Sequence, residues 1–117
     1  MSASAEDCIF CKIVRRELPA KEVFRDDDIV AFRDLNPQAP THILVAPTQH
    51  AENLSAFLAS VDARGVQRLF EVASHLGKSL GTEGYRVVTN EGPEGGQTVN
   101  HLHVHVLAGR HMKWPPG

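Results

Sequence analysis

Residues 101–106 alternate strictly between histidine and aliphatic side chains, and this alternation limits the possible folds more than any other feature of the chain. Successive side chains of a β-strand point to opposite faces of a sheet. Residues 101–107 are therefore predicted to form a strand with Leu102, Val104 and Val106 on one face. The other face would carry three imidazoles, roughly 7 Å apart at successive steps. Such a strand needs a helix that covers its aliphatic face.

A long amphipathic helix is predicted over residues 62–80, where apolar side chains recur at steps of three and four. Gly81 is placed to end it. A shorter helix is predicted over residues 7–17, ended by Pro19. The apolar stripe of the long helix consists of Val66, Leu69, Phe70, Ala73, Leu76 and Leu80.

The remaining periodic segments predict strands, separated by turns rich in proline, glycine and aspartate. The sum is a single α+β domain, an antiparallel sheet with one long and one short helix. We expect residues 1–7 to be a flexible N-terminus and residues 8–117 to form the domain. The other predicted strands are 22–25, 29–34, 41–46 and 85–90, with loops at 36–40 and 91–97.

Charge and composition exclude several classes of partner. Twelve Lys and Arg stand against fourteen Asp and Glu, giving a formal net charge of −2, with no basic stripe for nucleic acid. No apolar run has the length of a transmembrane helix, and no signal peptide is evident. We therefore expect no nucleic-acid or membrane partner. Cys8 and Cys11 are too close together to staple distant loops, which favours a reducing, cytoplasmic setting.

Three interpretations of the histidine row are open. It can be a polar sheet face that happens to be rich in histidine, although Lys, Thr and Glu are the usual occupants. It can bind a metal, although no carboxylate lies within the strand. It can also supply a nucleophile, because neutral imidazole attacks phosphorus well near pH 7 and the resulting N–P bond hydrolyses readily.

The loop before the histidines favours the nucleophile. Glycines at 92, 95 and 96 would let backbone N–H groups approach an anion closely. Thr98 then offers a hydroxyl next to the first histidine. A glycine-rich loop alone is a weak signal, but its direct connection to alternating histidines strengthens the prediction of a phosphate site.

Three stretches resemble one known family. Residues 96–107, Gly-Gln-Thr-Val-Asn-His-Leu-His-Val-His-Val-Leu, resemble the signature of the histidine triad family. Residues 34–42 are similar to the family's upstream block, and residues 114–117, Trp-Pro-Pro-Gly, resemble its Hint branch of purine nucleoside phosphoramidases. The resemblance covers nearly the whole chain and implies the histidine triad fold, with two protomers forming a continuous sheet in a homodimer.

The resemblance also implies catalytic roles. His103 would attack the α-phosphorus and carry the nucleotidyl intermediate, while His105 would contact phosphate. His101 and His42 would complete the polar network that orients the nucleophile. Thr98 occupies the position of a Ser or Thr that hydrogen-bonds the leaving group.

The nucleotide contacts follow from the same resemblance. Asp34 would accept the ribose hydroxyls, and Asn90 with the backbone from Gly96 through Gln97 and Thr98 to Val99 would hold phosphate oxygens. Five apolar residues would enclose the base, although the sequence alone leaves open that they are ordinary core. They are Ile9, Phe10, Ile13, Phe32 and Leu35.

Cys8 and Cys11 have the spacing of half a zinc site. Similarity to zinc-containing relatives implies His50 and His101 as the other ligands, which would make His101 structural. The alternative is that the cysteines are two small buried apolar residues. The expected zinc is structural, and no cofactor is required for catalysis.

The leading functional hypothesis is an enzyme that cleaves the P–N bond of adenosine or purine 5′-phosphoramidates. The first alternative is a dinucleoside polyphosphate hydrolase or nucleotidyltransferase of the same superfamily. The second is a nucleotide-binding interaction module with weak catalysis. In the implied homodimer, residues 62–90 would pair across a two-fold axis and the Trp114 tail would lie near the partner's active site.

Overall fold

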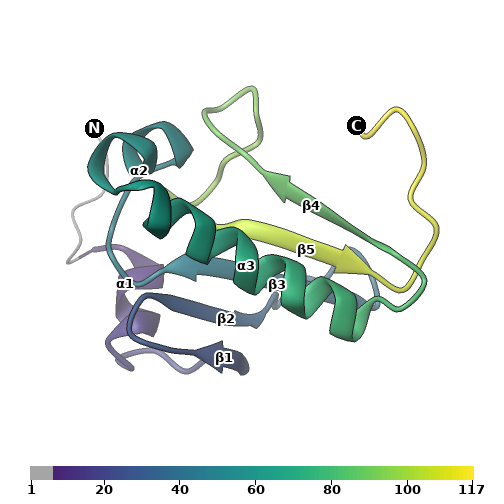
Figure 1. Cartoon of the computed structure of the whole chain (residues 1–117), viewed down its shortest axis with the longest axis horizontal. Helices are drawn as coiled ribbons and strands as arrows, with labels where there is room; N and C mark the ends of the chain where they lie inside the picture. Colours follow the sequence, from purple (N-terminus) through teal and green to yellow (C-terminus); the bar gives the residue numbers. More distant parts are fainter. Residues whose placement is uncertain (1–6) are drawn as a thin grey trace.

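The computed structural model of the protein describes residues 7–117, and the flexible terminus predicted for residues 1–7 falls largely outside them. A five-stranded antiparallel sheet forms the centre of the fold, in the order β1-β2-β3-β5-β4 (Figure 1). This arrangement confirms the predicted α+β class. The strands are β1 (Glu22–Arg25), β2 (Ile29–Arg33), β3 (Thr41–Pro47), β4 (Tyr85–Thr89) and β5 (Val104–Ala108).

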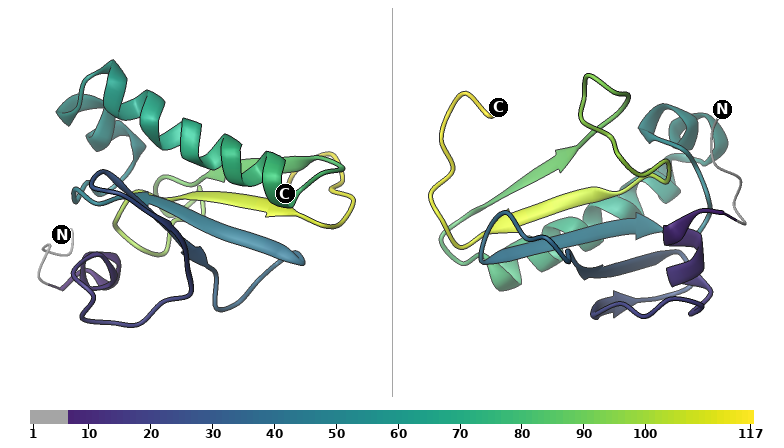
Figure 2. Two further views of the ribbon diagram at one scale, coloured as in Figure 1. Left: turned by 60° about the horizontal axis from the view of Figure 1, so that its bottom comes forward. Right: turned by 180° about the vertical axis from the view of Figure 1, so that it is seen from behind.

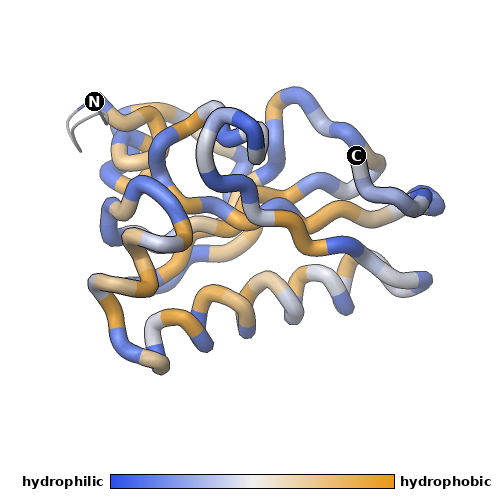
Figure 3. The backbone as a smooth tube through the Cα atoms, turned by 90° about the horizontal axis from the view of Figure 1, so that it is seen from above, coloured by the Kyte–Doolittle hydropathy of each residue, from blue (hydrophilic) through white to orange (hydrophobic). Residues whose placement is uncertain are grey.

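The long helix α3 (Ala63–Leu80) covers one face of the sheet, as its apolar stripe predicts. Figure 3 shows the alternation of apolar and polar residues along this helix where it runs beside the sheet. Leu69 and Leu76 pack against Leu102, Val104 and Val106, so the aliphatic positions of the alternating segment are buried under α3. Burying a Leu or Val side chain stabilises a fold by roughly 1.5–3 kcal/mol.

The opposite face is covered only in part, by the short helix α1 (Ile9–Val14) (Figure 2). Phe10 and Ile13 of α1 pack on Phe32, Leu44 and other side chains that point away from α3. Because α1 has only six residues, the strip of sheet beyond it can carry polar side chains. This uncovered strip holds the candidate site.

The helix predictions need two corrections. Helix α1 is shorter than the predicted 7–17, because Cys8 caps its N-terminus and Arg16 adopts a left-handed φ of 62°, well before Pro19. There are also two short helices rather than one, since α2 (Leu54–Ser60) precedes α3. Asn53 caps α2, with its side chain accepting a hydrogen bond from the Ala56 N–H.

The strand prediction for 101–107 is wrong at its start, since β5 begins at Val104. Pro47, at the end of β3, has no N–H that could donate to a neighbouring strand. Its carbonyl accepts a hydrogen bond from His101 Nε2. The Leu102 N–H donates to the Ala51 carbonyl in the loop after β3, which holds residues 101–103 outside the regular ladder. His101 and His103 therefore lie in a bent entry segment, and the three histidines do not form one straight row.

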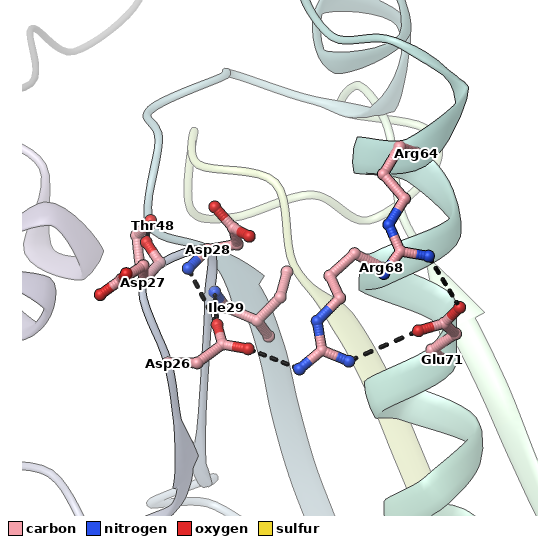
Figure 4. A network of polar contacts seen from close by, with 8 residues as sticks. All are labelled: Asp26, Asp27, Asp28, Ile29, Thr48, Arg64, Arg68 and Glu71. Carbon is pink, nitrogen blue, oxygen red and sulfur yellow. Dashed lines mark hydrogen bonds and ion pairs between the residues drawn. The ribbon is translucent and has the colours of Figure 1, made fainter.

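Polar contacts fasten the turn between β1 and β2 to α3 (Figure 4). Arg68 of α3 pairs with Asp26, whose other carboxylate oxygen accepts the N–H groups of Asp28 and Ile29. A partly exposed ion pair of this kind contributes about 1 kcal/mol or less. Among the described residues, no helix is long and apolar enough to cross a membrane.

Candidate functional site

A cavity of about 270 Å³ opens beside α1, on the sheet face away from α3. Ile9 is 54% and Leu35 92% exposed, whereas Phe10 and Phe32 are buried. Ile9 and Leu35 therefore form an apolar rim, while the two phenylalanines belong to both the core and the cavity wall. The sequence-predicted site residues that line the cavity are Ile9, Phe10, Ile13, Phe32, Asp34, Leu35, Thr98, Val99, His103 and His105.

His103 is held in one tautomer. Its Nδ1 lies 2.8 Å from the carbonyl oxygen of His101. Because a carbonyl can only accept, Nδ1 carries the proton and Nε2 keeps its lone pair. The Phe10 ring packs edge-on against the imidazole, with 5.0 Å between centroids. These contacts fix the ring and leave Nε2 as its basic nitrogen.

His105 and His42 form a second chain of hydrogen bonds across β3 and β5. The Gln38 N–H donates to His42 Nδ1 at 3.0 Å, and His42 Nε2 lies 2.9 Å from His105 Nδ1. Since the Gln38 N–H can only donate, neutral His42 carries its proton on Nε2, and this N–H donates a hydrogen bond to His105 Nδ1. His105 then carries its own proton on Nε2. Asp34 Oδ2, 3.5 Å from His42 Nε2, fits this assignment.

Burial keeps these imidazoles neutral at pH 7. Loss of solvent lowers the pKa of His42 and of His103, partly offset for His42 by the nearby Asp34 carboxylate. Burial, with the neighbouring His103 and His42, lowers the pKa of His105 to about 4. The site therefore offers an unprotonated nucleophilic nitrogen beside a ring N–H donor.

Cys8, Cys11, His50 and His101 meet in a separate cluster, with all four ligand atoms within 4.8 Å of one another. Cys11 Sγ lies 3.2 Å from His50 Nδ1, and the two histidine Nδ1 atoms are 3.3 Å apart. A tetrahedral zinc site with two sulfur and two nitrogen ligands has N–N edges of about 3.3 Å and N–S edges of about 3.6 Å. The cluster fits a structural zinc ion.

The tautomer of His101 agrees with metal binding. His101 Nε2 lies 2.8 Å from the Pro47 carbonyl oxygen, so Nε2 carries the proton and Nδ1 turns its lone pair toward the sulfurs. Burial lowers the pKa of His101 to about 4 and raises the pKa of the Cys11 thiol to about 11. A bound cation would offset the cost of the thiolate form.

Asp34, His42 and His105 also bring three potential ligand atoms within 4.8 Å of one another, but they are poorly suited to a metal. The 2.9 Å between His42 Nε2 and His105 Nδ1 is a hydrogen-bond distance. A metal on His42 Nε2 would require Nδ1 to carry the proton, and Nδ1 already faces the Gln38 N–H. We interpret this group as a hydrogen-bonded chain.

Three predicted phosphate contacts, Asn90, Gly96 and Gln97, are not part of the cavity lining. The Asn90 amide donates to the Gly95 carbonyl. The N–H groups of Gly92, Gly96 and Gln97 all donate to acceptors within the loop itself. These amides stabilise the turn in this structure, and their predicted contacts to phosphate stay a prediction.

Sequence reasoning predicted Gln97 only as a phosphate contact and missed the part its side chain plays in holding the site, and it missed Gln38 altogether. The Gln97 side chain donates to the carbonyls of Glu52 and Val99 and accepts from the Gly92 N–H, which fastens the loop before His101. Gln38 acts through its backbone amide. Neither has a pattern in the sequence, since an amide side chain or a backbone group in a loop carries no periodicity.

The family model of the HIT domain, the histidine triad domain, matches residues 15–112, and the chain belongs to this family. It is 52% identical over 113 residues to an uncharacterized HIT-like protein of Synechococcus elongatus, covering 97% of this chain and 99% of that protein. It is 49% identical to a 14 kDa zinc-binding protein of Zea mays, covering 93% and 87%.

A solved structure agrees with the fold. The chain superposes on a HIT family hydrolase from Legionella pneumophila with a TM-score of 0.90 and 43% sequence identity, covering 95% of this chain and all of that one. Together with the Cys8, Cys11, His50 and His101 geometry, the name of the maize relative supports the expected structural zinc.

Proposed function

We propose that the protein is a hydrolase that cleaves the P–N bond of purine nucleoside 5′-phosphoramidates through a nucleotidyl intermediate on His103. The observation that carries the proposal is the hydrogen bond from His103 Nδ1 to the His101 carbonyl, which leaves an unprotonated Nε2 on a residue that lines the cavity. The hydrolase name of the Legionella relative supports the reaction class.

In the first step, the lone pair of His103 Nε2 attacks the α-phosphorus and the P–N bond breaks. The imidazole becomes an N-phosphorylated imidazolium, and its Nδ1–H remains on the His101 carbonyl, which stabilises the new positive charge. His105 Nε2–H donates to a phosphate oxygen. The leaving amine takes a proton that the Thr98 hydroxyl relays from a water molecule, and the hydroxide so formed takes up the proton released in the second step.

In the second step, water attacks the same phosphorus and the P–Nε2 bond breaks. The electron pair returns to His103, and the water supplies the new oxygen of the nucleoside monophosphate and releases one proton. The net reaction consumes one water and yields a nucleoside 5′-monophosphate and an amine. Splitting the reaction at a histidine replaces one difficult displacement by two easier ones.

The lining of the cavity matches the chemistry of each part of a nucleotide, which supports the proposal. The apolar end with Ile13 and Phe32 suits a purine base, and Phe10 lies between this end and His103. Asp34, on the cavity wall, is a carboxylate that can accept both ribose hydroxyls. Neutral imidazoles and a hydroxyl then surround the phosphate, without a requirement for magnesium.

Cys8, Cys11, His50 and His101 would hold the zinc ion, whose contribution is structural. Cys8 and Cys11 flank Phe10, so the four ligands tie the cavity wall to the segment that carries His103. His101 takes part in both regions, through its ring in the cluster and through its carbonyl on His103.

The decisive experiment is mass spectrometry of the protein after brief mixing with an adenosine phosphoramidate. We expect an adenylyl adduct on His103, and no adduct with His103→Ala. Absence of the adduct in a protein that still releases the amine would show that hydrolysis proceeds by direct attack of water.

The second candidate function is hydrolysis of dinucleoside polyphosphates, favoured by the presence of the Arg33 cation at the cavity. A pyrophosphate leaving group needs cationic help, and residues 90–105 contain no lysine or arginine. We therefore expect kcat/KM for adenosine phosphoramidate to exceed that for diadenosine polyphosphate by roughly a hundredfold, about 2.7 kcal/mol. Equal efficiency, or strict dependence on magnesium, would favour the polyphosphate.

The proposed enzyme is a homodimer. Strand β4 ends the sheet and pairs only with β5 in the described chain, and Val87 on β4 and Phe70 on α3 are both 38% exposed. Trp114 is 81% exposed in the C-terminal tail. A second copy could continue the sheet at β4 and receive the tail. A monomer at micromolar concentration in solution scattering would contradict this assembly.

A further inference from the structure

The turn that follows β5 contacts the loop of residues 36–40 at two points. Gly109 has a φ of +95°, and a Cβ at this position would lie 2.8 Å from Pro40 Cβ. Only glycine combines this conformation with this approach. Arg110 Nε donates to the Gln38 carbonyl oxygen at 2.9 Å. We name this pair of contacts the Gly109–Arg110 clamp.

The clamped loop presents the Gln38 N–H to the site. The Gln38 N–H donates to His42 Nδ1, and this bond stands at the outer end of the chain that runs through His42 to His105. His42 is only 6% exposed, so water has little room to replace the amide. The Gln38 amide thus acts together with the Asp34 carboxylate, 3.5 Å from His42 Nε2, to keep the proton of His42 on Nε2.

We propose that the Gly109–Arg110 clamp is a positioning device that fixes the tautomer of His105. With the clamp closed, the Gln38 amide keeps the proton of His42 on Nε2, and His105 in turn keeps its proton on Nε2. Without the amide, His42 can carry its proton on Nδ1 and accept from His105 Nδ1–H. His105 Nε2 then has no proton and presents its lone pair.

The consequence for the site rests on the proposed function. A ring N–H donates to a phosphate oxygen, whereas a ring lone pair repels it. The His105 imidazole therefore changes from a hydrogen-bond donor to phosphate into a group that repels phosphate, with no change in its charge. Arg110 and Gly109 act at a distance from the phosphate, through Gln38 and His42, and do not touch the substrate themselves.

The test is long-range ¹H–¹⁵N NMR of the zinc-loaded full chain, which distinguishes protonated from unprotonated ring nitrogens. In the wild type we expect His42 and His105 to carry their protons on Nε2. Arg110→Ala should reveal the Nδ1–H form of His105 and speed exchange of the Gln38 amide by roughly threefold to tenfold, as expected for loss of one hydrogen bond. Gly109→Ala should have a larger effect.

The matched control is Arg86→Ala. Arg86 also donates to a backbone carbonyl at 2.9 Å, that of Lys113, but this bond does not involve the 36–40 loop. We expect wild-type tautomers and wild-type Gln38 exchange in this variant. In turnover assays, Arg110→Ala should lower kcat several-fold with a nearly unchanged KM.

The proposal is overturned if His105 carries its proton on Nδ1 in the wild type. It is also overturned if Arg110→Ala leaves both the tautomer and the Gln38 exchange rate unchanged, and this variant decides the matter even if Gly109→Ala does not fold. The NMR measurements need no substrate. Expected tautomers in a protein that fails to cleave phosphoramidates would therefore overturn the proposed function and leave the clamp standing.

Discussion

Two neighbouring groups of histidines serve different chemistry in this protein. His50 and His101 meet two cysteine sulfurs, and all four ligand atoms converge on one point. His42 Nε2 donates a hydrogen bond to His105 Nδ1, with 2.9 Å between the two nitrogens. The residue type is the same, and both groups are largely shielded from water. The difference lies in the second ring nitrogen and in the backbone group that it faces.

In the metal cluster, His101 Nε2 faces the Pro47 carbonyl. Nε2 therefore carries the proton, and Nδ1 turns its lone pair toward the cysteines. In the hydrogen-bonded chain, His42 Nδ1 faces the Gln38 amide. The proton of His42 is therefore on Nε2, which points toward His105. A backbone carbonyl thus leaves the other ring nitrogen with a lone pair that can bind a metal, whereas a backbone amide leaves the other ring nitrogen as a hydrogen-bond donor. For His101 and His42, the facing backbone group thus sets the role of the imidazole.

The largest effect is expected from His103→Ala, which removes the proposed nucleophile between the two groups. Turnover should fall by roughly 10⁴-fold or more, because the covalent route is lost. Nucleotide binding should remain measurable by calorimetry, since the apolar cavity is retained. His75→Ala is the matched control, since His75 is exposed on α3, and it should keep full activity. Near-normal turnover of the His103 variant would exclude His103 as the nucleophile.

Removal of the metal should act on stability more than on chemistry. Binding free energy at a structural zinc site contributes to folding, so a chelator should lower Tm by roughly 10 °C or more. A Cys8→Ser/Cys11→Ser variant should start from the lower Tm and no longer respond to the chelator. Scanning calorimetry with elemental analysis provides the measurement. If the protein contains no zinc after zinc loading and its Tm is unchanged, the cluster with the cysteines is not a metal site. The proposed difference between the two groups of histidines would then be wrong.

A smaller effect is expected from pH. The folded-state pKa of His105, about 4, lies below its ordinary value of 6.5, so the unfolded chain binds the proton first as pH falls. Stability should therefore decrease from about pH 6.5 down to about pH 4, with no contribution from His105 above that range. Urea unfolding of zinc-loaded His105→Asn should show a weaker dependence on pH than the wild type. Equal slopes would show that His105 does not titrate differently in the two states.

Much of the fold follows from local periodicity. The stripe of α3 and the burial of Leu102, Val104 and Val106 are visible in the sequence and confirmed in the structure. Helix α2 has only seven residues, too few for a clear period, and its one signal is the capping Asn53. Periodicity thus predicts the long elements and misses the short ones.

The candidate site was predictable as a set of residues but not as an arrangement. The spacing of Cys8 and Cys11 indicates a zinc site, and the alternation marks the histidines. The separation of His101 from His103 depends on the Pro47 carbonyl, and the donor state of His105 depends on the Gln38 amide. Backbone groups are identical in every residue, so no sequence pattern announces which of them will face an imidazole.

The alternation through residues 102–106 also governs which changes of length the gene can tolerate. One extra or missing codon between Leu102 and His105 would exchange the two faces, sending imidazole under α3 and aliphatic groups into the cavity. The exposed turn at residues 93–95 carries no such constraint. Libraries of insertions and deletions should thus survive at this turn and be eliminated ten residues later.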